Sequence, residues 1–211
     1  MNWKQIPLGP LQTNCYVLYD NEKDAVIFDP GGDAPILKKW LQENELKPLA
    51  ILLTHAHFDH IGAVSEIRQL YNIEVYLHEK EKDWLTDPHK NGSALFMGDE
   101  FITSEQADHH INREGKLSIG SFSFEMFETP GHSPGSVSFY HSESETIFSG
   151  DVLFSGSIGR TDLPGGSHQE LLNSIHDKLI DLPENTQVAC GHGPTTTIGA
   201  EMDSNPFLNG F

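Results

Sequence analysis

The sequence predicts a single α/β domain over residues 1–211. Strand-like and helix-like runs alternate along the chain, and no Ser/Pro-rich linker or internal repeat separates them. A chain of 211 residues is long enough to bury one full hydrophobic core. Its hydrophobic fraction of 37% and charged fraction of 21% are those of an ordinary globular protein, so we expect no disordered or fibrous segment.

The first third of the chain predicts strands that pair and a helix that covers them. The β-branched and aromatic runs 16–19 and 25–28 flank a turn-like segment, which indicates a hairpin. Residues 35–46 carry apolar side chains at one-sided helical spacing, and Asp33 is a candidate N-cap. Leu49–Leu53 is an apolar run that predicts a buried strand.

A second apolar stripe, from Ile61 to Leu70, predicts another helix. Residues 54–60 therefore lie between the end of a buried strand and the start of a helix. Functional sites of α/β folds commonly lie at such junctions.

The second half of the chain predicts another sheet. Short strands are indicated at 122–126, 136–140 and 145–148. Ser167 and Glu170 form a capping box in front of a predicted helix. The intervening segment 87–120 has weak periodicity and many polar residues, so we expect it to be loop-rich and to form a flap within the domain.

Charge excludes several classes of partner. There are 13 Lys and Arg against 31 Asp and Glu, a formal net charge of −18, which disfavours nucleic acid and acidic membrane surfaces. No apolar run approaches the length of a membrane span. We expect a cytoplasmic protein, a monomer or small homo-oligomer, that acts on a small molecule, with Cys15 and Cys190 reduced and buried.

One segment has the spacing of a metal site. Thr54–His60 contains three histidines and one aspartate, His55, His57, Asp59 and His60. Imidazole nitrogens and carboxylate oxygens are ligands that zinc, iron and manganese accept, and closely spaced ligands on one turn can converge on an ion.

Three later segments also place a possible metal ligand after a strand-like run. His132, Asp151 and His192 each follow a strand-like run and lie beside glycines. Glycine lets the backbone turn sharply at a strand end and leaves room for a cation. We therefore interpret all seven residues as metal ligands.

These motifs resemble those of the metallo-β-lactamase-fold hydrolases, and within them a short form of the glyoxalase II-like (hydroxyacylglutathione hydrolase-like) branch. The shared pattern is THxHxDH followed by a lone His, a lone Asp and a last His, over nearly the whole chain. The resemblance implies a four-layer αββα sandwich and two divalent metal ions, most commonly Zn²⁺, with Fe or Mn as alternatives. It assigns His55, His57 and His132 to one ion, Asp59, His60 and His192 to the other, and Asp151 as a bridge.

The expected activity is hydrolysis of a thioester, such as a hydroxyacyl thioester of a low-molecular-weight thiol. Two cations can hold a bridging water as hydroxide near neutral pH, and Asp59 would also orient it. No G-x-S-x-G nucleophile motif occurs. Cys190 is more simply interpreted as a buried packing residue than as a ligand or nucleophile.

Substrate recognition departs from the family pattern. Glyoxalase II enzymes carry a Lys and a Tyr after the bridging Asp, and Arg160 and Asp162 occupy those places here. Arg160 is a candidate substrate-binding residue, since it could pair with a carboxylate of the substrate. The alternative is a structural ion pair with Asp162.

Other functions remain open at this point. An iron-dependent persulfide dioxygenase of the same superfamily would use one iron at positions such as His55, His132 and Asp151, although the chain keeps all ligands of the second position. A metal-stabilised binding protein without turnover is a third alternative. β-Lactam hydrolysis is not expected of a cytoplasmic protein.

Overall fold

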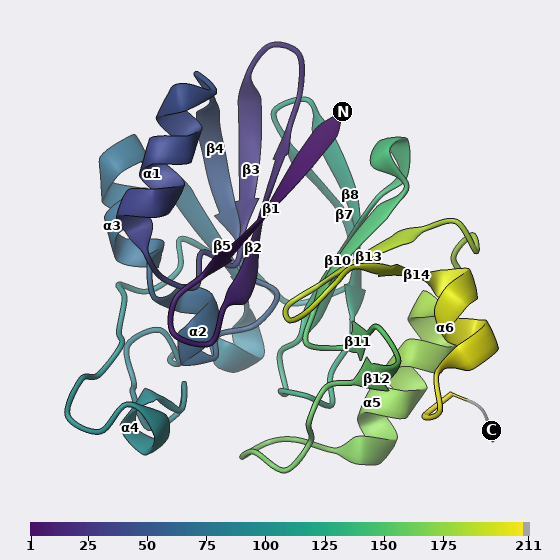
Figure 1. Ribbon diagram of the computed structural model, residues 1–211. Helices are drawn as coiled ribbons and strands as arrows, with labels where there is room; N and C mark the ends of the chain where they lie inside the picture. The colour runs from purple at the N-terminus through teal and green to yellow at the C-terminus, as the bar shows by residue number, and fades with distance from the viewer. Residues whose placement is uncertain (209–211) are drawn as a thin grey trace. The chain divides into compact units, whose positions relative to one another are not determined.

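The computed structural model describes residues 1–208 and divides into two compact units (Figure 1). The N-terminal unit comprises Met1–Asn112 with Ile119–Ser121, and the C-terminal unit comprises Arg113–Ser118 with Phe122–Phe211. Each unit contains one six-stranded sheet and its own helices. Two mixed sheets flanked by helices confirm the predicted α/β class. Among the residues described, no helix combines the length and apolar character that a membrane crossing requires.

The sheet of the N-terminal unit has the order β1-β2-β3-β4-β5-β6. Its strands are β1 (Asn2–Leu8), β2 (Thr13–Tyr19), β3 (Asp24–Phe28), β4 (Lys47–Leu52), β5 (Glu74–His78) and β6 (His109–Ile111). The first three strands are antiparallel neighbours, and the remaining pairings from β3 to β6 are parallel. The predicted hairpin is confirmed, with Val17 opposite Ile27.

Two helices of this unit, α1 (Ala34–Glu43) and α3 (Val64–Tyr71), cover one face of the sheet. The unit also contains α2 (Phe58–Ile61), the 3-10 turn η1 (Glu79–Glu81) and α4 (Ser93–Phe96). Leu37 of α1 and Ile67 of α3 belong to a buried cluster that includes Ile27 and Ile51 of the sheet. These strand residues alternate with others that point to the opposite face, as the pleat requires.

Two predicted helix boundaries were wrong. The helix expected over 35–46 ends at Glu43, because Glu45 adopts a left-handed backbone with φ 57°. The helix expected from Ile61 is divided into α2 and α3. Asp33 does occupy the N-cap position of α1, but its carboxylate accepts a hydrogen bond from the Gly9 N–H instead of capping the helix.

The sheet of the C-terminal unit has the order β14-β13-β10-β9-β8-β7. Its strands are β7 (Gly115–Ile119), β8 (Phe122–Glu128), β9 (Val137–His141), β10 (Thr146–Gly150), β13 (Gln187–Cys190) and β14 (Thr196–Thr197), and β11 (Leu153–Phe154) with β12 (Ser157–Ile158) forms a separate hairpin. β10 is antiparallel to β9 and parallel to β13. The second sheet predicted from the sequence is confirmed.

Three helical elements of the C-terminal unit pack on this sheet. They are α5 (His168–Ser174), the π-helical turn η3 (Ile175–Leu179) and α6 (Ile198–Ser204). Leu171 and Ile175 belong to one buried cluster with Ile147 and Val188 of the strands. The predicted N-cap is confirmed, since Ser167 Oγ accepts a hydrogen bond from the Glu170 N–H at 3.3 Å.

The segment 87–120, expected to be loop-rich, contributes short elements to both units. It includes α4 and the strands β6 and β7, and residues 97–108 between them form no helix or strand. Because β6 and β7 are the edge strands of their sheets, the segment is only partly irregular. Its role as a flap stays a prediction.

Candidate metal centre

In the N-terminal unit, the four predicted ligands of the motif come together immediately after β4. His57 is the N-cap of α2, which contains Asp59 and His60, and all four ligands are buried. The ring centroid of His55 lies 4.8 Å from that of His57 and 4.1 Å from that of His60. Nε2 of His60 lies 3.6 Å from Oδ2 of Asp59. This unit therefore presents three imidazoles and one carboxylate on a single turn.

Asp29 contacts one of these imidazoles directly and a second one through Thr54. It follows β3 directly and is buried. Its Oδ2 lies 3.0 Å from Nδ1 of His60 and accepts a hydrogen bond from the Thr54 hydroxyl at 2.6 Å. The same Thr54 oxygen lies 3.1 Å from Nδ1 of His55. A carboxylate only accepts, so His60 carries its proton on Nδ1.

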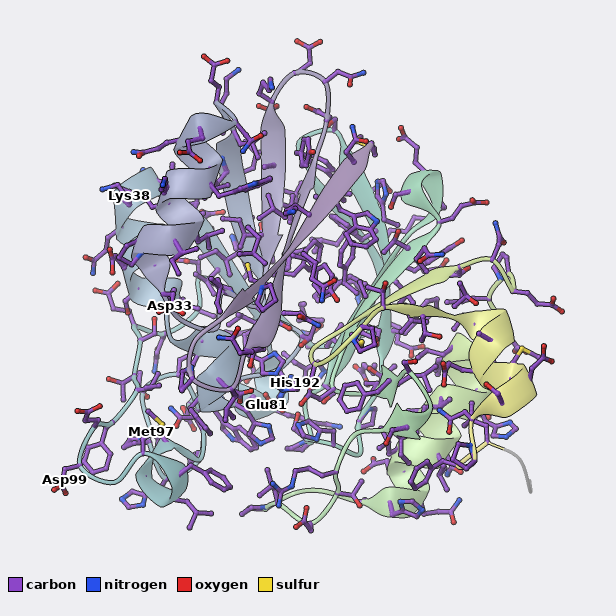
Figure 2. The ribbon with its side chains drawn as sticks, viewed as in Figure 1. Asp33, Lys38, Glu81, Met97, Asp99 and His192 are labelled. Carbon is purple, nitrogen blue, oxygen red and sulfur yellow. The ribbon has the colours of Figure 1, made fainter. Side chains whose placement is uncertain are left out.

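Two further residues hold the ligand turn in place. The Thr13 hydroxyl donates to Oδ2 of Asp59 at 2.8 Å, which fixes the rotation of that carboxylate. Glu81 of η1, labelled in Figure 2, is buried. Its Oε2 accepts a hydrogen bond at 2.7 Å from the N–H of Ala56, the residue between His55 and His57. Outer partners of this kind hold metal ligands in their orientation.

In the C-terminal unit, the three predicted ligands also converge. Asp151 and His192 follow β10 and β13, whose carboxyl ends lie at the same edge because the strands are parallel. Oδ2 of Asp151 lies 3.5 Å from Nε2 of His192 and 3.6 Å from Nε2 of His132. Nδ1 of His132 lies 2.8 Å from the carbonyl oxygen of Arg160.

The donor set of each unit fits a divalent cation. A carbonyl oxygen only accepts, so Nδ1 of His132 donates to Arg160, and Nε2 is the ring atom that faces Asp151. The same reasoning applies to His60 and Asp59, because Asp29 holds the proton on Nδ1. A cation bound to both the unprotonated Nε2 and the carboxylate oxygen would hold the two groups at this separation. Imidazole and carboxylate together suit zinc, iron and manganese.

The chain matches the sequence profile of the Metallo-beta-lactamase superfamily over residues 8–192, a range that contains all seven predicted ligands. It belongs to this superfamily. The resemblance drawn from the sequence motifs is thereby confirmed, as is the metallo-β-lactamase fold of two mixed sheets flanked by helices.

Two curated relatives match nearly the whole chain. It is 54% identical over 211 residues to "Probable metallo-hydrolase YqgX" of Bacillus subtilis, covering 100% of this chain and 99% of the relative. It is 41% identical to "Hydroxyacylglutathione hydrolase GloC" of Haemophilus influenzae, with 99% of each chain covered. The relatives place the chain among the metal-dependent hydrolases of the metallo-β-lactamase superfamily.

Two solved structures are similar over their whole length. The structure titled BLEG-1 B3 metallo-beta-lactamase has a TM-score of 0.98 and 62% identity, covering 99% of this chain and 100% of that one. TTHA1623 in a di-iron-bound form has a TM-score of 0.86 and 41% identity, covering 97% and 100%. The second structure shows that a relative binds two metal ions.

Arg160, predicted to bind substrate, is engaged with its neighbour in this superfamily member. Its Nε and Nη2 donate to the two carboxylate oxygens of Asp162 at 2.7 and 2.8 Å. Both side chains are exposed, and the hydrogen bonds from Arg160 lower the pKa of Asp162 to about 2. The structural ion pair considered from the sequence is thus present. Substrate recognition by Arg160 stays a prediction.

Cys190 behaves as the predicted packing residue. Both cysteines are thiols and not part of a disulfide, and both are buried. The Cys190 thiol donates toward the carbonyl oxygens of His192 and Pro194 at 3.2 and 3.3 Å. Burial raises the pKa of this thiol to about 12, so it stays protonated near neutral pH and is a poor nucleophile.

The sequence analysis missed Thr13, Asp29 and Glu81, although one signal for Asp29 was available. Asp29 stands directly after a strand-like apolar run, the position from which Asp151 was recognised. Thr13 begins a strand and Glu81 lies in a short turn, and neither position carries a motif. Their partners lie far away in sequence, 46 residues for Thr13 and 25 for Glu81.

Proposed function

We propose that this chain is a metal-dependent thioester hydrolase that acts on a hydroxyacyl thioester of a low-molecular-weight thiol. The ligand assignment is the one that the family resemblance implies. His55, His57 and His132 would hold one divalent ion, Asp59, His60 and His192 the second, and Asp151 would bridge them. Zinc is the proposed metal, and the di-iron relative makes iron the main alternative.

The observation that carries this proposal is the tautomer pattern of the ligands. Carboxylate and carbonyl partners accept hydrogen bonds from Nδ1 of His60 and His132, which leaves Nε2 of each ring facing a carboxylate. Nε2 is thereby the nitrogen that each ring offers to a metal, and the outer partners hold it in that orientation. The thioester specificity draws its support from the similarity to GloC, whose name states hydroxyacylglutathione hydrolysis.

The chemistry divides between the metals and the chain. When bound, two divalent ions polarise an acyl carbonyl and lower the pKa of a water toward neutrality. Asp59, held by Thr13, orients that water for attack on the carbonyl carbon. With the Cys190 thiol protonated, water is the nucleophile in this proposal. A thiolate is a good leaving group and needs less acid assistance than an amine.

The deciding experiment joins metal analysis to a substrate panel. Protein purified without chelator is measured for moles of metal per chain and then assayed for thiol release from thioesters that differ in thiol and acyl group. Two ions per chain with release of thiol support the proposal. One iron per chain with oxygen uptake on persulfides would replace it with the dioxygenase, and two ions without thiol release would reject the thioester assignment.

β-Lactam hydrolysis is a second candidate, because the structure with 62% identity is titled a B3 metallo-beta-lactamase. The same metal chemistry could open a lactam ring. A chromogenic cephalosporin assayed beside the thioesters separates the two activities, and a kcat/KM for the lactam above that for every thioester would make it the leading function. A cytoplasmic location and a monomeric or small homo-oligomeric state stay predictions.

A further inference from the structure

One buried carboxylate in the N-terminal unit serves two metal ligands at once. Oδ2 of Asp29 lies 3.0 Å from Nδ1 of His60 and 2.6 Å from the Thr54 hydroxyl, while Oδ1 accepts the Thr54 N–H at 2.8 Å. Asp29 is 3% exposed and lies at the end of β3 with φ 46°. A non-glycine residue held in the left-handed region needs strong local support, and these hydrogen bonds provide it.

The second ligand is reached through a relay. The Thr54 hydroxyl has one proton, and because a carboxylate cannot donate, that proton points to Asp29. The Thr54 oxygen is then an acceptor for Nδ1 of His55, 3.1 Å away. Nδ1 of His55 therefore carries a proton, and Nε2 holds the lone pair. Asp29 thus fixes the tautomer of His60 directly and that of His55 through Thr54.

In the proposed ligand assignment, His55 and His60 belong to different metal ions, so this inference rests on the two-metal site of the proposed function. We propose that Asp29 is a positioning residue shared by both metal positions. Its carboxylate holds both rings, one at each ion, in the orientation in which Nδ1 donates and Nε2 is left for the metal. Loss of that carboxylate weakens both metals together, which loss of an outer partner serving one ligand does not do.

The chain offers matched variants that act on one position each. Thr54→Val removes the hydroxyl that reaches His55 but leaves the contact between Asp29 and His60. Thr13→Val removes the hydrogen bond to Asp59, a ligand of the other ion. Thr54→Ser and Thr13→Ser keep the hydroxyl groups and serve as rescue variants. Asp29→Asn keeps the shape, and asparagine tolerates the left-handed backbone.

The experiment loads each variant with zinc, equilibrates it against a graded series of chelator concentrations, and measures moles of zinc retained per chain. We expect Asp29→Asn to release both ions at a chelator concentration about 10- to 100-fold lower than the unmodified chain requires. This is the order of effect found for outer partners of metal ligands. Thr54→Val and Thr13→Val should each lower the chelator concentration at which one of the two ions is released. The serine variants should release both ions at the same concentration as the unmodified chain.

A result in which Asp29→Asn retains both ions as firmly as the unmodified chain, or weakens one alone, overturns the inference. So does binding of one zinc by the unmodified chain. The readout needs no turnover: the expected release pattern in a protein that hydrolyses no thioester rejects the proposed function and supports the role of Asp29.

A measurement on the unmodified protein covers the case in which Asp29→Asn fails to fold. Proton NMR of the zinc-loaded chain should show hydrogen-bonded, slowly exchanging Nδ1 protons on both His55 and His60. Thr54→Val should remove or shift the His55 signal and leave the His60 signal in place. Absence of either Nδ1 proton in the unmodified chain contradicts the relay.

Discussion

Asp59 illustrates how one side chain is specified by its neighbours. It is buried, it accepts a hydrogen bond from Thr13, and its Oδ2 faces Nε2 of His60. A carboxylate in such surroundings is unfavourable without a compensating positive charge. Its position is therefore explained by metal binding better than by packing.

Replacement of Asp59 by Ala should reduce thioester turnover by about 10²–10³-fold or more, because one ligand and the group that orients water are both lost. The fold should persist, since Asp59 lies outside the buried apolar cluster of its unit. Thiol release, metal content and far-UV circular dichroism measured on one preparation check this. Unchanged turnover with two ions bound would contradict the role given to Asp59.

Arg160 and Asp162 allow a paired test of substrate recognition. Arg160→Ala should raise KM for thioesters that carry a carboxylate by about 10-fold, because a charge-assisted hydrogen bond is lost, with little change for neutral thioesters. Asp162→Asn should have the opposite effect, since it releases the guanidinium from its bidentate partner. Steady-state kinetics on one anionic and one neutral thioester suffice, and equal effects on both substrates would remove Arg160 from recognition.

At the scale of elements, ligands follow strand ends where the backbone turns sharply. Gly131, directly before His132, has φ 130°, and its carbonyl oxygen accepts the Ser167 N–H at 2.7 Å. A Cβ added to Gly131 would overlap the backbone of Leu171 in α5. The turn that carries Gly131 and His132 is therefore packed directly against the start of α5.

Gly131→Ala should destabilise the protein by about 1–3 kcal/mol, because the new methyl group forces the turn before His132 away from α5. Gly156→Ala is the matched control: it also has a left-handed φ, of 69°, but an added Cβ has no heavy atom within 4 Å. We expect about 1 kcal/mol there from backbone strain alone. Urea unfolding of both variants measures the difference, and equal losses would show that the close approach is unimportant.

The elements that the sequence predicted well are those with local signals. The hairpin of β2 and β3, the strand β4 and the cap of α5 each follow from apolar alternation or a capping pair. The early end of α1 depends on a left-handed glutamate, Glu45, which no propensity indicates. The carboxylate of Asp33 accepts a hydrogen bond from Gly9, 24 residues away. A rule based on neighbouring residues cannot predict such a contact.

At the scale of the whole molecule, negative charge predominates, and two of the candidate ligands carry part of it in buried positions. The chain has a formal net charge of −18, and Asp59 and Asp151 are both buried. The seven candidate metal ligands could be picked out from the sequence, because they lie in dense motifs or at glycine-flanked strand ends, and their role as ligands stays a prediction. The residues behind them could not be picked out, since Asp29 reaches Thr54 and His60 across 25 and 31 residues.

Removal of metal by a chelator should lower the melting temperature. A site saturated at about 100 times its dissociation constant contributes about 2.7 kcal/mol, and in a chain of this size each kcal/mol corresponds to about 2–4 °C. We expect a fall of about 5–10 °C for each ion, measured by scanning calorimetry. Added zinc should restore the original value and added magnesium should not, because imidazole ligands suit zinc. An unchanged melting temperature would contradict a metal-stabilised fold.

The parallel pairing of β10 with β13 has a consequence for folding during synthesis. Thr146 pairs with Gln187, a separation of 187 − 146 = 41 residues, so the strand that precedes His192 leaves the ribosome well after β10. His55 to His60 are complete much earlier and need partners no further along than Glu81. Ligand pairing in the C-terminal unit therefore waits until β13 has been made, and nascent chains would gain the full set of candidate metal donors only after the turn from His55 to His60 is complete.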